Sequence, residues 1–156
     1  MSNVTKNGVQ TIVTLDFGKW FYQEKQIKNV PTVDGIYVAH AGTLIEENGK
    51  EVFSPDRVIY IGKGTGTDNV HVRIGQHVNN DHAAWKKHLK AGESILYTYA
   101  DCSANIVGDV EAALIYKNKP LENTNSKDSY TGNTHFISVK FTGEAIGALK
   151  ETGLVL

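Results

Sequence analysis

The stretch VIYIGKGTG, residues 58–66, begins as a β-strand and ends in alternating glycines. Its first four residues are β-branched or aromatic, as a packed strand prefers. The glycines do not match a phosphate-binding loop, because the P-loop order is missing and a threonine stands at position 67, where the dinucleotide fingerprint needs glycine. The simpler interpretation is a sharp turn from a strand into a helix. It leaves Tyr60 and Lys63 at the end of the strand, where side chains can reach a cleft.

The neighbouring sequence predicts an antiparallel sheet around this strand. The segments GIYVAHA (35–41) and TLIEENGKEVF (43–53) are extended, and Asn48-Gly49 is typical of a two-residue hairpin turn. Pro55 and Asp56 are expected to turn the chain into the strand at 57–62, which makes the GIY and YIG strands candidate neighbours. A further strand is expected at 94–100, and helices at 70–78, 82–90 and 103–118.

The two ends of the chain predict additional elements. Residues 9–15 and 135–141 are expected to be strands, residues 144–151 a short helix, and Asp16 is expected to cap a helix that ends near residue 28. Strands and helices mix without strict βαβ alternation, which favours an α+β fold. We expect one domain, residues 1–156, with a small antiparallel sheet flanked by helices: a three-stranded core with an extra hairpin and terminal strands.

The composition limits the class of protein. The net charge of −1 argues against a strong, non-specific nucleic-acid binder, although residues 57–119 are slightly basic and hold both arginines. Any nucleic-acid-binding face should therefore be small and local. Cys102 is the only cysteine, which excludes an internal disulfide and fits a reducing compartment. No apolar run approaches the roughly 20 residues needed to span a bilayer, so we expect a soluble cytoplasmic protein with no membrane partner.

Glu111 is the most informative single residue. On the helix expected at 103–118, it projects near the middle of the apolar face. A carboxylate in apolar surroundings is costly unless it is paired or holds a cation. Two interpretations follow: a buried salt bridge, for which Arg73 is the obvious partner, or a functional role such as binding a metal ion.

Several basic residues are candidates for binding an anion. Arg73 follows the glycine loop on the next helix, and His77 lies one turn further on the same face. A guanidinium fork suits a phosphate or a carboxylate. Lys86 and Lys87 are most simply the solvated face of a helix, and a contact with nucleic acid is the alternative. The six histidines match no zinc motif, and most of them are expected to be solvated.

Taken in order, these residues resemble the GIY-YIG nuclease superfamily. The resemblance covers about residues 34–125 and leaves N- and C-terminal elaborations outside it. It is carried by Gly35-Ile36-Tyr37, Tyr60-Ile61-Gly62 with Lys63, Arg73 with His77, Glu111, and Asn123 after Pro120.

The resemblance implies a three-stranded antiparallel sheet with flanking helices, and cleavage of phosphodiester bonds with one Mg²⁺ or Mn²⁺ ion. Glu111 would be the sole protein ligand of that ion, which suits Mg²⁺ because it keeps several waters. Tyr60 would activate the attacking water, directly or in a network with Tyr37, and nearby cations are expected to favour its phenolate. Arg73 would hold the scissile phosphate. The remaining roles would be assistance from Lys63, orientation or deprotonation of the nucleophile by His77, support of the site by Asn123, and further substrate contacts from Lys86 and Lys87.

The expected substrate is nucleic acid, DNA rather than RNA. The alternative is an inactive domain of the same fold that binds nucleic acid or a protein partner. Twenty-two residues separate Tyr37 from Tyr60, a longer spacing than is usual in the family, and the excess corresponds to the hairpin at 42–56. This hairpin is either a simple lengthening or a flap that faces the substrate. The sequence leaves the oligomeric state open.

Overall fold

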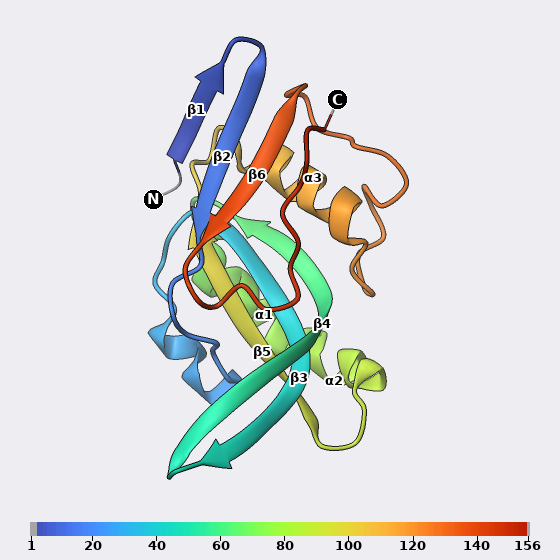
Figure 1. The fold of residues 1–156 in the computed structure, drawn as a ribbon. Helices are drawn as coiled ribbons and strands as arrows, with labels where there is room; N and C mark the ends of the chain where they lie inside the picture. The colour runs from blue at the N-terminus through green and yellow to red at the C-terminus, as the bar shows by residue number, and fades with distance from the viewer. Residues whose placement is uncertain (1–2, 156) are drawn as a thin grey trace.

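A computed structural model describes residues 3–155, which form a small α+β fold with two three-stranded sheets (Figure 1). The central sheet has the order β4-β3-β5 and the second sheet the order β1-β2-β6. The elements of the central sheet and its helices are β3 (Gly35–Glu47), β4 (Lys50–Gly64), β5 (Glu93–Asp101), α1 (Val70–Asn80), α2 (His82–Trp85), η2 (Lys86–His88) and α3 (Val107–Asn118). The second sheet contains β1 (Asn3–Asn7), β2 (Gln10–Asp16) and β6 (Ile137–Thr142), and η1 (Glu24–Asn29) links β2 to β3.

The central sheet is antiparallel throughout, with β3 between its two partners. The register places Tyr37 opposite Gly62 and Ala39 opposite Tyr60, so the GIY and YIG tripeptides lie side by side. This confirms that the two strands are neighbours. It also confirms the strand expected at 94–100 and the helix expected after the glycine loop.

The hairpin at 42–56 is a continuation of β3 and β4. Asn48 and Gly49 have φ values of 53° and 76°, as the predicted two-residue turn requires. The turn expected at Pro55 and Asp56 is wrong, because β4 runs through both residues. An edge strand tolerates proline, since its outward N–H needs no partner. Figure 1 shows the resulting ribbon reaching beyond α2 to the bottom of the view.

The two faces of β3 build two separate cores, as the alternation of side chains along a strand requires. Ile36 and Val38 pack with α3 and with residues of the second sheet. Tyr37 and Ala39 pack with residues of η1, α1, α2 and β5. Tyr37 therefore lies beneath α1, on the opposite face of the strand from Ile36.

The terminal regions differ from the expectation in three ways. The strands expected at 9–15 and 135–141 exist, but with β1 they form a separate sheet in which β2 and β6 are parallel. The helix expected to begin after Asp16 is wrong for residues 17–23, which are not helical, and η1 begins only at Glu24. The Asp16 carboxylate instead accepts the N–H of Gly18 (2.9 Å) in a local turn. The helix expected at 144–151 is also wrong, since Gly143 and Gly147 have φ values of 93° and 64° and make turns. None of the helices in residues 3–155 is long and apolar enough to cross a membrane.

Candidate functional site

The candidate site is the cluster of Tyr37, Tyr60, Arg73, His77 and Glu111, contributed by β3, β4, α1 and α3. Electrostatic interactions join Tyr37 and Tyr60 to each other, and each of them to Arg73 and Glu111. Glu111 also interacts with Arg73 and with Lys63 at the end of β4. The structure therefore brings together side chains that are up to 74 positions apart in the sequence, from Tyr37 to Glu111.

Two glycines of the opening stretch make this convergence possible. A Cβ atom at Gly62 would lie less than 3.0 Å from Cζ and Oη of Tyr37, so only glycine lets the Tyr37 ring lie across β4. A Cβ atom at Gly64 would come equally close to the backbone between Asn69 and Val70. Glycine at this position allows the start of α1 to pack directly against the end of β4. The loop serves close approach of chain segments, as the turn interpretation predicts.

Aromatic rings pack around Tyr60 in the candidate site. The ring of Tyr60 lies 6.2 Å from Tyr37, 4.8 Å from His77 and 5.2 Å from Trp85, measured between centroids. Tyr37 is fully buried, with 0% of its surface exposed, whereas Tyr60 is half-buried. Of the two phenols, Tyr60 is therefore the one that a solvent molecule or a substrate can reach.

A chain of hydrogen bonds runs outward from the buried hydroxyl of Tyr37 through His77 to Asp81, whose side chain is 49% exposed. The hydroxyl of Tyr37 lies 2.7 Å from Nε2 of His77, and Nδ1 of His77 lies 2.7 Å from Oδ2 of Asp81. Burial lowers the pKa of His77, and the charge of Asp81 opposes this shift only in part. The imidazole is therefore neutral at neutral pH. An ionised carboxylate can only accept, so Nδ1 carries the proton and Nε2 accepts the hydroxyl of Tyr37.

Glu111 is a largely desolvated carboxylate. Burial raises its pKa, while the charges of Lys63 and Arg73 and a hydrogen bond from the Lys63 backbone lower it. Among the ion pairs of the described residues, none joins Arg73 to Glu111, and the Arg73 guanidinium instead donates to Oε1 of Gln76 (3.0 Å). The buried salt bridge, one of the two interpretations of Glu111, is therefore not what the structure contains.

No family model, curated protein or solved structure matches this chain. A function for this chain is therefore inferred from the geometry and electrostatics of the candidate site.

Both tyrosines of the candidate site have raised pKa values. Burial raises the pKa of Tyr37, and the charge of Tyr60 adds to this effect. Burial also raises the pKa of Tyr60, followed by the charge of Glu111, and the opposing effect of Arg73 is smaller. Arg73 thus favours the Tyr60 phenolate, as the sequence predicts for a nearby cation. Desolvation of the ring and the charge of Glu111 outweigh this effect, so the net pKa of Tyr60 is raised.

Asn123 lies behind the candidate site, on the outer edge of β4. Its side-chain oxygen accepts the N–H of Ile61 (2.9 Å), and its amide donates to the carbonyl of Ile61 (2.8 Å). The backbone N–H of Glu122 also donates to the carbonyl of Ile59 (2.9 Å). These bonds satisfy the free edge of the strand that carries Tyr60, which is a supporting position and not one in contact with a substrate.

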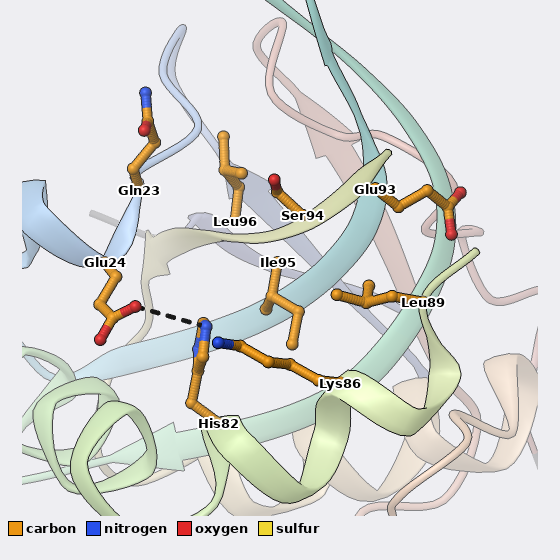
Figure 2. A pocket seen from close by; sticks show the side chains of 9 residues that line it. All are labelled: Gln23, Glu24, His82, Lys86, Leu89, Glu93, Ser94, Ile95 and Leu96. Atoms are coloured by element: carbon orange, nitrogen blue, oxygen red, sulfur yellow. Dashed lines mark ion pairs between the residues drawn. The ribbon is translucent and has the colours of Figure 1, made fainter. Parts of the chain in front are cut away.

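Lys86 and Lys87 lie outside the cluster. The ammonium of Lys87 is 3.4 Å from Oε2 of Glu122. Lys86 points into a separate cavity of about 380 Å³ beside β5, which it lines with His82 and Glu24 (Figure 2). In that cavity Nε2 of His82 lies 3.6 Å from the carboxylate of Glu24. Contacts of these two lysines with a substrate remain a prediction that would need a ligand extending beyond the candidate site.

The sequence does not predict two residues that contact the cluster. Asp81 orients His77 through a hydrogen bond, and Trp85, which is 4% exposed, stacks on the ring of Tyr60. Asp81 follows His77 by four residues, a spacing that brings two side chains together on one face of a helix. This spacing is the signal in the sequence that could have indicated the pair. His40, His77 and His82 are buried, so the expectation that most histidines are solvated is also wrong for these three.

Proposed function

We propose that this protein is a metal-dependent endonuclease of the GIY-YIG type that hydrolyses phosphodiester bonds, with DNA as the expected substrate. The observation that carries the proposal is the convergence of two phenols, a guanidinium and one desolvated carboxylate at the end of β4. Hydrolysis of a phosphodiester needs an activated water and stabilisation of the charge that develops on the phosphate. The candidate site offers one set of groups for each requirement.

The phenols and His77 supply a path for the proton of the attacking water. Tyr60, the more exposed of the two phenols, takes this proton as its own hydroxyl proton passes to Tyr37, and Tyr37 passes its proton to Nε2 of His77. A hydrogen bond with Tyr37 lowers the pKa of Tyr60 and so favours the first transfer. The carboxylate of Asp81 stabilises the imidazolium that forms. In this scheme the raised pKa of each tyrosine is no obstacle, because neither needs to persist as a phenolate.

Arg73 and Lys63 bind the substrate phosphate. Arg73 is half-buried beside the two phenols, and Lys63 is exposed at the end of β4. The ammonium of Lys63 lies near Gly108, where an added Cβ atom would be 3.4 Å from it, so it faces the N-terminal part of α3. Both cations would flank a phosphate bound beside Tyr60, where such groups stabilise the charge of a transition state.

Glu111 fits the metal ion that this activity requires. It is desolvated, has no ion pair with Arg73 among the described residues, and interacts electrostatically with both phenols. The residues that the structure describes contain no cluster of three or more His, Cys, Asp and Glu side chains suited to a metal ion, so Glu111 would hold Mg²⁺ or Mn²⁺ with waters and the substrate phosphate. When bound, the ion neutralises charge on the phosphate and the leaving oxygen.

The test is cleavage of supercoiled plasmid and of branched DNA by the purified protein in Mg²⁺ or Mn²⁺. We expect nicking or cutting that EDTA abolishes, and that Glu111→Gln and Arg73→Ala lose. Glu144→Gln is the matched control, since Glu144 is exposed and lies outside both the candidate site and the 42–56 hairpin, and it should cleave at the wild-type rate. Equal cleavage by the Glu111→Gln and Glu144→Gln proteins would contradict the proposal.

The same experiment distinguishes the alternative. Binding of DNA by gel shift that persists in Glu111→Gln, with no cleavage by the wild type in either metal, would favour a binding domain. A labelled RNA of the same sequence as the cleaved DNA tests the choice of substrate.

A further inference from the structure

A second feature, separate from the candidate site, is a hollow of about 220 Å³ beside the segment that links β2 to η1. It is lined by Asp16, Phe17, Gly18, Lys19, Trp20, Tyr22, Tyr99 and Asp101. None of these residues belongs to the candidate site. The hollow combines aromatic rings with acidic side chains, and each of these two components has a consequence for what could bind there.

The aromatic components are Trp20, Tyr22 and Tyr99. Trp20 leaves 68% of its surface exposed, an unusual state for the largest apolar side chain. The rings of Tyr22 and Tyr99 lie 6.0 Å apart and are tilted by 44°, so they form an angled wall. Trp20 and Tyr22 also border a neighbouring hollow of about 320 Å³. The indole thus projects between two depressions and is not packed into the core.

The backbone holds this arrangement in place. Tyr22 forms two hydrogen bonds with Tyr97 of β5, from Tyr22 N to Tyr97 O (2.7 Å) and from Tyr97 N to Tyr22 O (2.8 Å). The turn before it is fixed by the hydrogen bond from Gly18 N–H to Asp16. The segment that carries Trp20 is therefore anchored at both ends, and a ligand would meet a preformed surface.

The acidic components are Asp16 and Asp101. Burial is the main cause that raises the pKa of Tyr99, and the charges of Tyr22, Asp101 and Asp16 act in the same direction. Both carboxylates thus lie within electrostatic range of the Tyr99 hydroxyl. Lys19 is the single cation in the lining. The aromatic faces are therefore accompanied by two carboxylates and one ammonium group.

We propose that this hollow binds an organic cation, a methylated ammonium or a guanidinium group, with Trp20, Tyr22 and Tyr99 as the aromatic walls. A cation is attracted to the faces of aromatic rings, most strongly to tryptophan. The carboxylates of Asp16 and Asp101 add Coulomb attraction. An uncharged apolar ligand would gain nothing from the carboxylates, and a metal ion would gain little from three rings, so the combination selects a cation with an apolar surface.

The experiment uses the two tryptophans of the chain, Trp20 and Trp85, which give two indole N–H signals in a ¹⁵N-labelled protein. Choline is titrated beside 3,3-dimethylbutan-1-ol, its uncharged isostere, and arginine in a third series. We expect choline or arginine to shift the Trp20 signal saturably, while the Trp85 signal stays fixed and the alcohol has no effect. The comparison of choline with arginine identifies which cation is preferred.

Two variants complete the test. Trp20→Ala assigns the signals, and an unchanged Trp85 signal in it shows that the fold persists. Lys19→Gln removes the competing cation and should bind the preferred ligand more tightly, by about two- to fivefold for one exposed charge. Equal shifts with choline and the uncharged alcohol, or no shift of Trp20 with either cation, would overturn the proposal. Because DNA cleavage is measured separately, failure here leaves the proposed nuclease activity untouched, and the reverse also holds.

Discussion

Substitution of Gly62 by alanine tests the geometry on which the candidate site depends. Tyr37 and Gly62 are paired across β3 and β4, and the ring of Tyr37 occupies the space where a side chain of residue 62 would stand. An added methyl group would lie less than 3.0 Å from Cζ and Oη of this fully buried ring. Because core side chains enclose the ring on all sides, the clash can be relieved only if strand β4 or the whole Tyr37 residue is displaced.

The cost can be estimated from two contributions. Overpacking a core typically costs about 1–3 kcal/mol. Displacing the Tyr37 hydroxyl from His77, now 2.7 Å away, costs a further contribution of about 1 kcal/mol. For a domain of this length each kcal/mol lowers the melting temperature by about 2–4 °C. We therefore expect Gly62→Ala to melt roughly 5–15 °C below the wild type.

Gly75→Ala is the matched control, measured by circular dichroism in the same buffer. Gly75 lies inside α1, and a Cβ atom there would meet nothing within 4 Å. This variant should gain about 0.5–1 kcal/mol, because alanine favours a helix over glycine. Below both transitions, Gly62→Ala should cleave DNA about 100-fold more slowly, since a displacement of about 1 Å costs that much. A Gly62→Ala protein that melts at or above the wild-type temperature would refute the described packing of Tyr37.

Three further predictions concern single side chains. Glu111→Gln should melt at or above the wild-type temperature at pH 7, because burial raises the pKa of Glu111 and its charged form therefore destabilises the fold. The difference in melting temperature, measured by calorimetry, should vanish near pH 4, where the wild-type carboxyl is protonated. Asn123→Ala should lower stability by about 2–4 kcal/mol in urea unfolding, since two buried backbone groups of Ile61 lose their partner. Asp81→Asn should slow cleavage at least about tenfold and move the acid limb of the pH–rate profile to lower pH, because the carboxylate raises the pKa of His77; an unchanged profile would contradict the assigned role.

The central sheet could be predicted from the sequence because its signals are local. Alternating β-branched residues mark β3, β4 and β5, and Asn48-Gly49 fixes the register of the hairpin. The segment after Asp16 could not be predicted in the same way. Its aromatic residues resemble the apolar face of a helix, but Tyr22 pairs with Tyr97, 75 positions away in the sequence, and this non-local pairing wins over local helix propensity.

The same difference between local and non-local signals applies to the candidate site. The contact of Tyr37 with Gly62 follows from two tripeptides on adjacent strands, so the sequence predicts it. The role of Asp81 does not follow, because it depends on how α1 ends and on which nitrogen of His77 carries the proton. The raised pKa of Tyr60 could not be anticipated either. It is the net result of burial and three surrounding charges, and only their positions decide the sign.

The strongest physical reason for a functional site is that the cluster is electrostatically unfavourable as a purely structural device. A structural arrangement would pair Arg73 with Glu111, yet the guanidinium bonds Gln76 and the carboxylate stays desolvated with a raised pKa. Two tyrosines with raised pKa values lie against the same carboxylate. The cluster therefore breaks local rules of stability, and clusters of perturbed titratable groups are found more often at catalytic sites. A metal ion that binds together with a phosphate would neutralise the unfavourable charge of Glu111, and the phosphate would give the Arg73 guanidinium an anionic partner. Addition of Mn²⁺ with a non-hydrolysable DNA duplex should therefore raise the melting temperature of the wild type more than that of Glu111→Gln.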